Sequence, residues 1–386
     1  MVVQSDAGGN TVKTGALKIA FRVDASIQMG TGHVMRCLTL ADALRLQGIE
    51  CLFICREHPG NLIEHIRNKG FQVHALPLTD NAEANLITVN VRTAVPQLAH
   101  SSWLGSTQEN DAAECTTILS DLRPDWLIVD HYALDARWET ALKPHYRKLM
   151  AIDDLADRPH RCDLLLDQTF GRNAEDYAPW LPNACTLLCG SQYSLLRPEF
   201  AALRTSSLAR REMPKLEHLL ITMGGVDKDN ATGQVLKALK SSNLPEDCRI
   251  TVVMGATAPW LADVHQLAEQ MPWATSVKVS ISDIAQLMAN SDLAIGAAGA
   301  TSWERCCLGL PTLMLVLADN QQEVAQNLER ANAVCLLRSP LEILDCLPPL
   351  LNKLVSSQAQ RASMSQAASN ITDGHGVATV IHHLEL

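Results

Sequence analysis

The sequence predicts an α/β fold with two doubly wound, Rossmann-like domains that face a central cleft. Short apolar, β-branched runs alternate with amphipathic helical segments along most of the 386 residues, which is typical of parallel sheets. A chain of this length is also too long for one compact core. The succession of strand, glycine turn and helix that opens near residue 17 occurs again near residue 216, which indicates a second domain.

The first half begins with the clearest unit of this pattern. Residues 17–23 (LKIAFRV) predict a strand, residues 24–32 a glycine-bearing turn and residues 33–47 a helix. Val34, Leu38 and Ala41 give that helix one apolar face, and Gly48 suits the position just after its end. Further strands are expected at 51–55, 72–76, 125–130, 149–154 and 163–167, with helices at 61–69 and after Asp135.

Two segments of the first half fall outside the pattern. Residues 1–16 are polar and glycine-rich, so we expect a disordered leader and not a signal peptide. Residues 79–114 form a polar stretch without strong periodicity, and such stretches are usually functional or mobile. The expected folded domains are then 17–198 and 199–386.

The second half repeats the logic of the first. Strands are expected at 216–222, 249–255, 276–280, 292–297 and 312–316, and helices from about 229, near 260, from 282 and from 301. Open α/β sheets bind ligands beyond the carboxyl ends of their strands. We therefore expect both domains to present those ends to the cleft.

Charge and cysteine content exclude several classes of function. The net charge of −10 argues against nonspecific binding to nucleic acid or an anionic membrane, and no run of 18 apolar residues suggests a membrane span. The twelve cysteines contain no CxxC pair, which favours buried, reduced thiols in a cytosolic protein. We expect a cytoplasmic protein without metal, cofactor, nucleic-acid, membrane or obligate protein partner.

The turn after the first strand is the first candidate site. Gly30, Thr31 and Gly32 allow close approach of a ligand to the backbone, and the following helix start can face an anion. His33 at that start can be held neutral by the helix dipole, which suits a general base. Arg36, one turn later, can offer a charge-assisted hydrogen bond. The alternative is an ordinary glycine turn with a partly exposed histidine.

A second candidate is the small-residue turn at 296–300, which precedes a helix. Gly299 leaves room for a diphosphate, and Thr301 and Ser302 can supply hydroxyl donors. Glu304 can accept hydrogen bonds from both hydroxyls of a ribose through its two oxygens. The alternative role of Glu304 is to complement the helix dipole.

Two further strand ends lie on the same predicted sheet. Asn320 follows the strand at 312–316 and can reach the cleft, although ordinary helix capping explains it nearly as well. Gly225 belongs to a glycine turn at 223–227, which either binds a ligand or only connects two elements.

Charged residues also mark strand ends of the first domain. Asp130 and Tyr132 follow one strand and are expected to point into the cleft. Asp153 and Asp154 end the next strand; since neighbouring residues face opposite ways, we favour hydrogen-bonding roles over a metal site. Arg197, between the domains, is a candidate for binding a phosphate or the substrate, or else forms a salt bridge at the hinge.

Together these segments resemble the UDP-2,4-diacetamido-2,4,6-trideoxy-β-L-altropyranose hydrolases of pseudaminic acid biosynthesis. The resemblance runs in order from about residue 17 to residue 376, and the leader and residues 80–100 fall outside it. It is carried by RVDAS, GTGHVMRCLTLADAL, VDHYALDARWE, AIDDLADRPHRCDLLLDQ, YSLLRPEF, GAAGATSWERCCLGLP and DGHG.

The resemblance implies a GT-B fold related to MurG-type glycosyltransferases, with UDP bound chiefly by the C-terminal domain and the sugar directed toward the N-terminal one. It implies that His33 is the catalytic base, that Glu304 and Asn320 bind substrate, and that Arg197 is a candidate binding residue. The expected reaction is hydrolysis of the UDP-sugar with inversion.

Two other functions fit the same residues. A GT-B glycosyltransferase would share the fold and the UDP site but pass the sugar to an acceptor other than water. A non-catalytic sugar-nucleotide-binding protein would share the UDP site and lack turnover.

Overall fold

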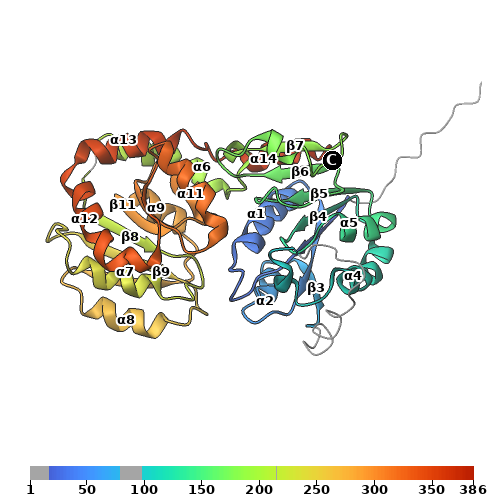
Figure 1. Cartoon of the computed structure of the whole chain (residues 1–386), viewed down its shortest axis with the longest axis horizontal. Coiled ribbons are helices and arrows are strands. Elements are labelled where there is room, and N and C mark those ends of the chain that lie inside the picture. Colours follow the sequence, from blue (N-terminus) through green and yellow to red (C-terminus); the bar gives the residue numbers. More distant parts are fainter. Residues whose placement is uncertain (1–16, 79–97, 214) are drawn as a thin grey trace, which may run out of the picture.

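The computed structural model describes residues 17–78, 98–213 and 215–386, so the expected leader at 1–16 lies outside the described residues. Figure 1 shows two α/β lobes side by side, each built on a parallel sheet. None of the described helices is long and apolar enough to cross a membrane. The expected arrangement of two Rossmann-like domains is confirmed.

The first lobe holds a seven-stranded sheet in the order β3-β2-β1-β4-β5-β6-β7, with all strands parallel. The strands are β1 (Lys18–Val23), β2 (Glu50–Arg56), β3 (Gln72–Leu76), β4 (Trp126–Asp130), β5 (Lys148–Ile152), β6 (Leu164–Asp167) and β7 (Thr186–Cys189). The helices around it include α1 (Gly32–Leu46), α2 (Ile63–Asn68), α4 (Gln108–Leu122) and α5 (Ala136–Leu142).

Alternation along the strands builds a core on each face of this sheet. Ile19, Phe21 and Val23 of β1 pack with α1 on one face, while Ala20 of the same strand packs on the other, in a cluster with Leu119 of α4. Since both faces are covered, the strands are apolar almost throughout. This continuous apolar character is the reason the sequence marks them clearly.

The second lobe holds a six-stranded parallel sheet in the order β10-β9-β8-β11-β12-β13. The strands are β8 (His218–Thr222), β9 (Arg249–Met254), β10 (Thr275–Val279), β11 (Leu293–Ala297), β12 (Thr312–Leu315) and β13 (Cys335–Leu337). The helices are α6 (Pro198–Arg210), α7 (Ala231–Leu239), α8 (Leu261–Glu269), α9 (Ile284–Asn290), α10 (Thr301–Cys307), α11 (Gln322–Arg330), α12 (Ile343–Ser356) and α13 (Gln358–Ser369).

The polar stretch expected at 79–114 is shorter on its C-terminal side. Helix α4 already begins at Gln108, where the Thr107 side chain accepts a hydrogen bond from the Asn110 amide. Its buried Asp111 binds Arg22 and Arg56 through their guanidinium groups. Because a charged residue occupies a buried position, the apolar periodicity of the helix is interrupted there, and the sequence did not indicate where the helix begins. Residues 79–97 lie outside the described residues.

The chain ends on the first lobe. Helix α14 (Gly376–His383) packs against α1, and Val380, Ile381 and Leu384 join the first lobe's core. The indole of Trp126 donates a hydrogen bond to the Leu384 carbonyl, 3.1 Å away. The expected second domain, 199–386, therefore includes a helix that the structure places on the first lobe.

Candidate functional site

The strand orders place a topological switch point in each lobe. Successive strands run outward in opposite directions from β1 and β4 in the first sheet and from β8 and β11 in the second. Such points open a crevice beyond the carboxyl ends of the strands. The turns after β1, β8 and β11 hold the predicted glycines, so sequence and topology indicate the same places.

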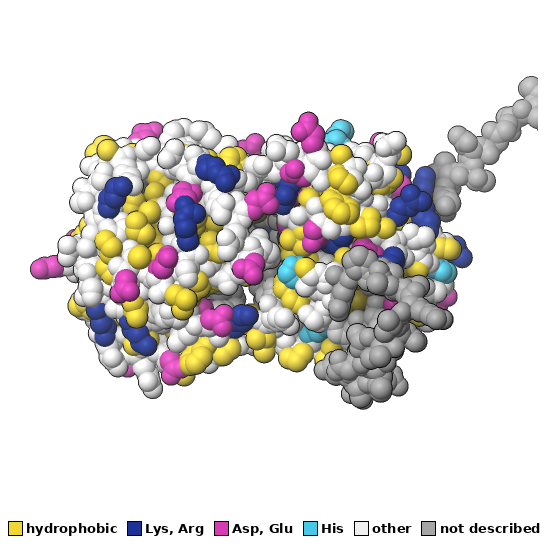
Figure 2. All heavy atoms as spheres, in the orientation of Figure 1, with side chains coloured by type: hydrophobic (Ala, Val, Ile, Leu, Met, Phe, Trp, Pro, Cys, Tyr) yellow, Lys and Arg dark blue, Asp and Glu magenta, His cyan; other side chains and the backbone are white. Residues whose placement is uncertain are grey.

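The turns of the two lobes touch one another. A Cβ atom built on Gly32 would lie 3.7 Å from the Cβ of Ala300, and one built on Gly225 would lie 3.3 Å from Oγ1 of Thr31. Figure 2 shows the viewed face hollowed along this junction, with positive and negative side chains interspersed over its described part. The GTGH turn of the first lobe therefore faces the glycine turns of the second.

His33 lies at this junction, in the first turn of α1. Its side chain is 13% exposed, and its Nδ1 is buried, 4.0 Å from Oδ1 of Asp130. Burial lowers the pKa of His33 to about 4, with Asp130 opposing the shift and Arg36 adding to it. The imidazole is thus neutral at pH 7. The sequence suggested the helix dipole as the cause, whereas burial is the larger one.

Arg36 organises the residues beneath His33. Its Nε and Nη2 donate to the two carboxylate oxygens of Asp130 at 2.6 and 2.7 Å, and its Nη1 donates to Asp154 at 2.5 Å. Tyr132 donates its hydroxyl to the same Asp154 oxygen at 2.8 Å. Arg36 and His33 hold the pKa of Asp130 below its usual value against the effect of burial.

This arrangement corrects the role expected for Asp130. The residue is fully buried, and both of its oxygens bind Arg36, so it is not available to a substrate. It contacts His33 and Arg36 instead: one carboxylate oxygen lies 4.0 Å from Nδ1 of His33, and both accept hydrogen bonds from Arg36. Arg36 and Tyr132 are also largely buried, which leaves only small parts of each accessible from the junction.

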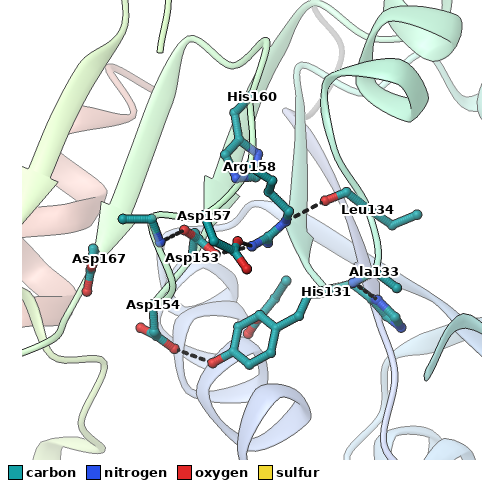
Figure 3. Close-up of polar contacts among 12 residues, drawn as sticks. His131, Ala133, Leu134, Asp153, Asp154, Asp157, Arg158, His160 and Asp167 are labelled. Atoms are coloured by element: carbon teal, nitrogen blue, oxygen red, sulfur yellow. Dashed lines mark hydrogen bonds and ion pairs between the residues drawn. The ribbon is translucent and has the colours of Figure 1, made fainter. Parts of the chain in front are cut away.

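The neighbouring aspartates Asp153 and Asp154 face different partners, as Figure 3 shows. Asp153 is fully buried, pairs with Arg158 at 2.7 Å and accepts from the Tyr177 hydroxyl at 2.9 Å. Within the described ranges, no three His, Cys, Asp or Glu side chains are grouped as metal ligands. The two carboxylates serve in hydrogen-bonded ion pairs, the role the sequence favoured.

The sequence did not single out an aromatic cluster beside His33. The ring of Tyr132 meets that of His33 edge-on, with centroids 4.6 Å apart. Trp103 stacks on Tyr132 at 5.8 Å and lies 6.4 Å from His33, and His100 contacts both Trp103 and Tyr132 at 4.5 and 5.5 Å. Trp103 and His100 fall in the stretch that the sequence showed only as polar.

In the second lobe, the small-residue turn is open at Gly299. A Cβ built there would meet no heavy atom within 4 Å. Thr301 and Ser302 instead point back into the lobe, because Arg305 donates to both hydroxyls at 3.0 and 3.3 Å. Ser302 is fully buried, which corrects its expected role as a donor to the substrate.

Three further candidates, Glu304, Arg197 and Asn320, belong to the second lobe or to the connection that leads into it. Arg197 lies 3.8 Å from Glu304 and 3.1 Å from Glu199, so the salt bridge considered for Arg197 is present, while its side chain remains 25% exposed. Burial raises the pKa of Glu304, opposed by Arg197. Asn320 is exposed in a short 3-10 helix, Asp319–Gln321, after β12. Since β12 pairs with β11, it shares the sheet edge of Gly299.

Comparison with known proteins shows which fold the chain has. Residues 218–381 match the glycosyltransferase family 28 C-terminal domain. The crystal structure of Acinetobacter baumannii MurG is similar with a TM-score of 0.65 at 15% identity, over 96% of this chain and 99% of that one. The spinosyn rhamnosyltransferase SpnG complexed with thymidine diphosphate gives a TM-score of 0.59 at 16% identity, over 96% and 100%. The chain is a GT-B protein whose second lobe resembles the family 28 C-terminal domain.

Among individual proteins, the chain is similar to the UDP-2,4-diacetamido-2,4,6-trideoxy-β-L-altropyranose hydrolase of Campylobacter jejuni, with 25% identity over 312 residues, 80% of this chain and 95% of that one. This confirms the resemblance read from the motifs. An uncharacterised protein of Methanocaldococcus jannaschii is also 25% identical over 311 residues, and the match spans 80% of this chain but only 57% of that protein.

Proposed function

We propose that the protein hydrolyses UDP-2,4-diacetamido-2,4,6-trideoxy-β-L-altropyranose to UDP and 2,4-diacetamido-2,4,6-trideoxy-L-altrose, a step of pseudaminic acid biosynthesis. The observation that carries the proposal is the neutral imidazole of His33 at the junction of the lobes, with the buried Asp130 carboxylate behind it. The named activity of the Campylobacter relative supports the choice of substrate.

The second lobe holds UDP, and the sugar projects toward the first. A water attacks the anomeric carbon from the side opposite the diphosphate, and His33 takes one proton from that water. The bond from C1 to the diphosphate oxygen breaks, its electron pair leaves with UDP, and the configuration at C1 is inverted. Asp130 stabilises the imidazolium that forms, as a carboxylate does behind a catalytic histidine.

The leaving group needs stabilisation as negative charge develops on it. The backbone amides of Gly299 and Ala300 are assigned to this role, because Gly299 leaves the turn open, whereas the Ala298 amide donates to the Leu315 carbonyl. Preorganised donors of this kind supply a large part of the stabilisation in many enzymes. Glu304 and Asn320, at the same sheet edge, are assigned to the ribose and to the remaining polar groups of the nucleotide.

The test is an NMR time course with this sugar nucleotide in water enriched in heavy oxygen. We expect free sugar and UDP to form together, with the label in the sugar, because C1 is attacked. Label in UDP would show attack at phosphorus and contradict the mechanism. His33→Asn should lower turnover by about 10²–10⁴-fold and keep UDP affinity; a normal rate in that variant would remove His33 from its role.

The GT-B architecture and the likeness to MurG favour one second candidate, a transferase with an acceptor other than water. In that case the same time course leaves the sugar nucleotide intact until an acceptor is added. Binding of the sugar nucleotide by calorimetry, without release of UDP in the absence of acceptor, would favour the transferase over the hydrolase.

A further inference from the structure

Trp103 lies in a segment that is firmly attached to the first lobe. It belongs to the 3-10 helix η2 (Ser101–Leu104), whose last residue, Leu104, is 1% exposed in the core. Gly105 follows with φ +65°, and a Cβ built there would lie 2.7 Å from His58 and 2.9 Å from Leu78. This tight turn fixes the direction in which η2 leaves the lobe.

The three rings of Trp103, His100 and Tyr132 form one continuous group, which we call the aromatic wall. Trp103 and Tyr132 are within 28° of parallel, and His100 is tilted by 46° against each. Trp103 and His100 are each partly exposed. His33 adjoins the wall through Tyr132, and its ring centroid lies 6.4 Å from that of Trp103, so the wall begins directly beside His33.

The position of the wall limits what it can bind. Because His33 activates a water on the face of C1 opposite the diphosphate, the sugar ring lies between His33 and the second lobe. The part of the ligand nearest the wall is then the sugar and not the nucleotide. Aromatic rings favour apolar and polarised C–H surface, whereas hydroxyl groups require hydrogen-bonding partners.

The geometry points to Trp103 and His100 as specificity-determining residues. We propose that the aromatic wall binds the methyl-bearing surface of a 6-deoxy, di-N-acetylated sugar and selects it over sugars with more hydroxyl groups. Such a sugar carries three methyl groups, one at C5 and one in each acetamido group, where a fully hydroxylated N-acetylhexosamine carries one. This inference rests on the proposed function, since it concerns the sugar of the same substrate.

The test measures binding separately from turnover. In the His33→Asn background, calorimetry compares three ligands: UDP, UDP-N-acetylglucosamine and the UDP-diacetamido-trideoxy sugar. Trp103→Ala should weaken binding of the trideoxy sugar nucleotide about 10- to 100-fold, the range of a lost aromatic stack. The affinity for UDP should not change. Trp103→Phe, which keeps a ring, should lose less, and His100→Ala should show a smaller loss of the same selectivity.

Trp273→Ala is the matched control, because Trp273 is a partly exposed tryptophan of the second lobe that packs against the core there. It should change none of the three affinities. Equal affinity of Trp103→Ala and its parent for the trideoxy sugar nucleotide would overturn the proposal. So would an equal loss for UDP, because the effect would not be specific to the sugar.

The experiment distinguishes failure of the proposed hydrolysis from failure of the aromatic-wall proposal. If the chain with His33 intact binds the sugar nucleotide without releasing sugar, hydrolysis is disproved, while the ratio of the affinities for UDP and the sugar nucleotide still tests the wall. If that chain releases sugar and Trp103→Ala leaves the ratio unchanged, the wall is disproved and hydrolysis stands.

Discussion

Two opposing effects act on the pKa of His33: burial favours the neutral ring and lowers the pKa, whereas Asp130 favours the charged ring and raises it. Because burial dominates, the acid limb of kcat/KM should lie near pH 4 and not near the ordinary histidine value of about 6.5. Activity should therefore fall only as pH drops through about 4. A kcat/KM profile of the free enzyme measures this directly, and an acid limb near pH 6.5 would contradict the buried, neutral imidazole.

The same shift has a consequence for stability. The folded-state pKa lies below the unfolded one, so between about pH 6.5 and about pH 4 the unfolded chain binds a proton that the folded chain does not. His33 therefore lowers stability as pH falls through this window. His33→Asn should reduce this pH dependence in urea unfolding.

Gly299 offers a test of the nucleotide site that does not depend on catalysis. Since a Cβ at this position would contact nothing within 4 Å, Gly299→Val should leave the melting temperature nearly unchanged. If the diphosphate binds at this turn, the added methyl groups occupy its place and UDP affinity should fall at least tenfold. Calorimetry with UDP measures this; unchanged affinity would move the diphosphate elsewhere.

The residues of the site differ in how far the sequence could reveal them. His33 and Gly299 lie in or next to the turns that join a strand to the next helix, so their place at the carboxyl edge of a sheet could be predicted. The burial of Asp130 and Ser302 could not be predicted, because it depends on tertiary contacts. Arg36 donates a hydrogen bond to Asp130, and Arg305 donates one to Ser302. Trp103 carries no local signal at all, because only the tertiary fold brings it beside Tyr132.

At the scale of elements, α4 shows how a charged residue can anchor a helix. Asp111 accepts from Arg22 at 2.6 Å, from Arg56 at 2.7 Å and from the Trp138 indole at 2.9 Å, all fully buried. Asp111→Ala leaves two buried guanidinium groups without this partner and should cost about 3–5 kcal/mol. Urea unfolding measures the loss; a change below about 1 kcal/mol would show that the network is dispensable.

Low pH should weaken the ion pairs of Asp111 with Arg22 and Arg56. Arg22 and Arg56 hold the pKa of Asp111 below its usual value although burial opposes this. Its contribution is thus present above the unfolded pKa of about 3.9 and is lost as pH falls through the lower folded value.

The last helix, α14, depends on a glycine at its first residue. A Cβ on Gly376 would lie 2.5 Å from the carbonyl carbon of Tyr193 and 2.7 Å from the Ser194 nitrogen. Backbone atoms cannot move aside as a side chain does, so Gly376→Ala should cost about 1–3 kcal/mol. Thermal unfolding measures this, with Gly299→Ala as the matched glycine control; equal melting temperatures for the two would contradict the tight contact.

Elements were predicted well where apolar runs were long. The exceptions are β7 (TLLC) and β13 (CLL), which lie at the edges of their sheets and are too short for a clear apolar run. The packing of α14 on the first lobe could not be predicted either, because the sequence of an amphipathic helix does not indicate which core its apolar face joins.

For the whole molecule, contact between the lobes predicts communication between them. The GTGH turn touches the glycine turns at Ala300 and Gly225, so UDP bound in the second lobe should slow amide hydrogen exchange at residues 297–302 and also at residues 30–35. Exchange measured by mass spectrometry with and without UDP tests this. Protection confined to the first lobe would contradict UDP binding by the second.

The chain passes between the lobes twice, before α6 and again before α14, and the two passages touch. Ser191 donates its hydroxyl to the Ile371 carbonyl at 2.6 Å, and Gly376 lies against Ser194. Two adjacent tethers act mechanically as a double-pinned hinge: they permit bending about one axis and resist swivelling about the line that joins the lobes. We therefore expect the angle between the lobes to be the main coordinate along which UDP, the proposed product, leaves, and we expect a crosslink that fixes this angle to slow its release.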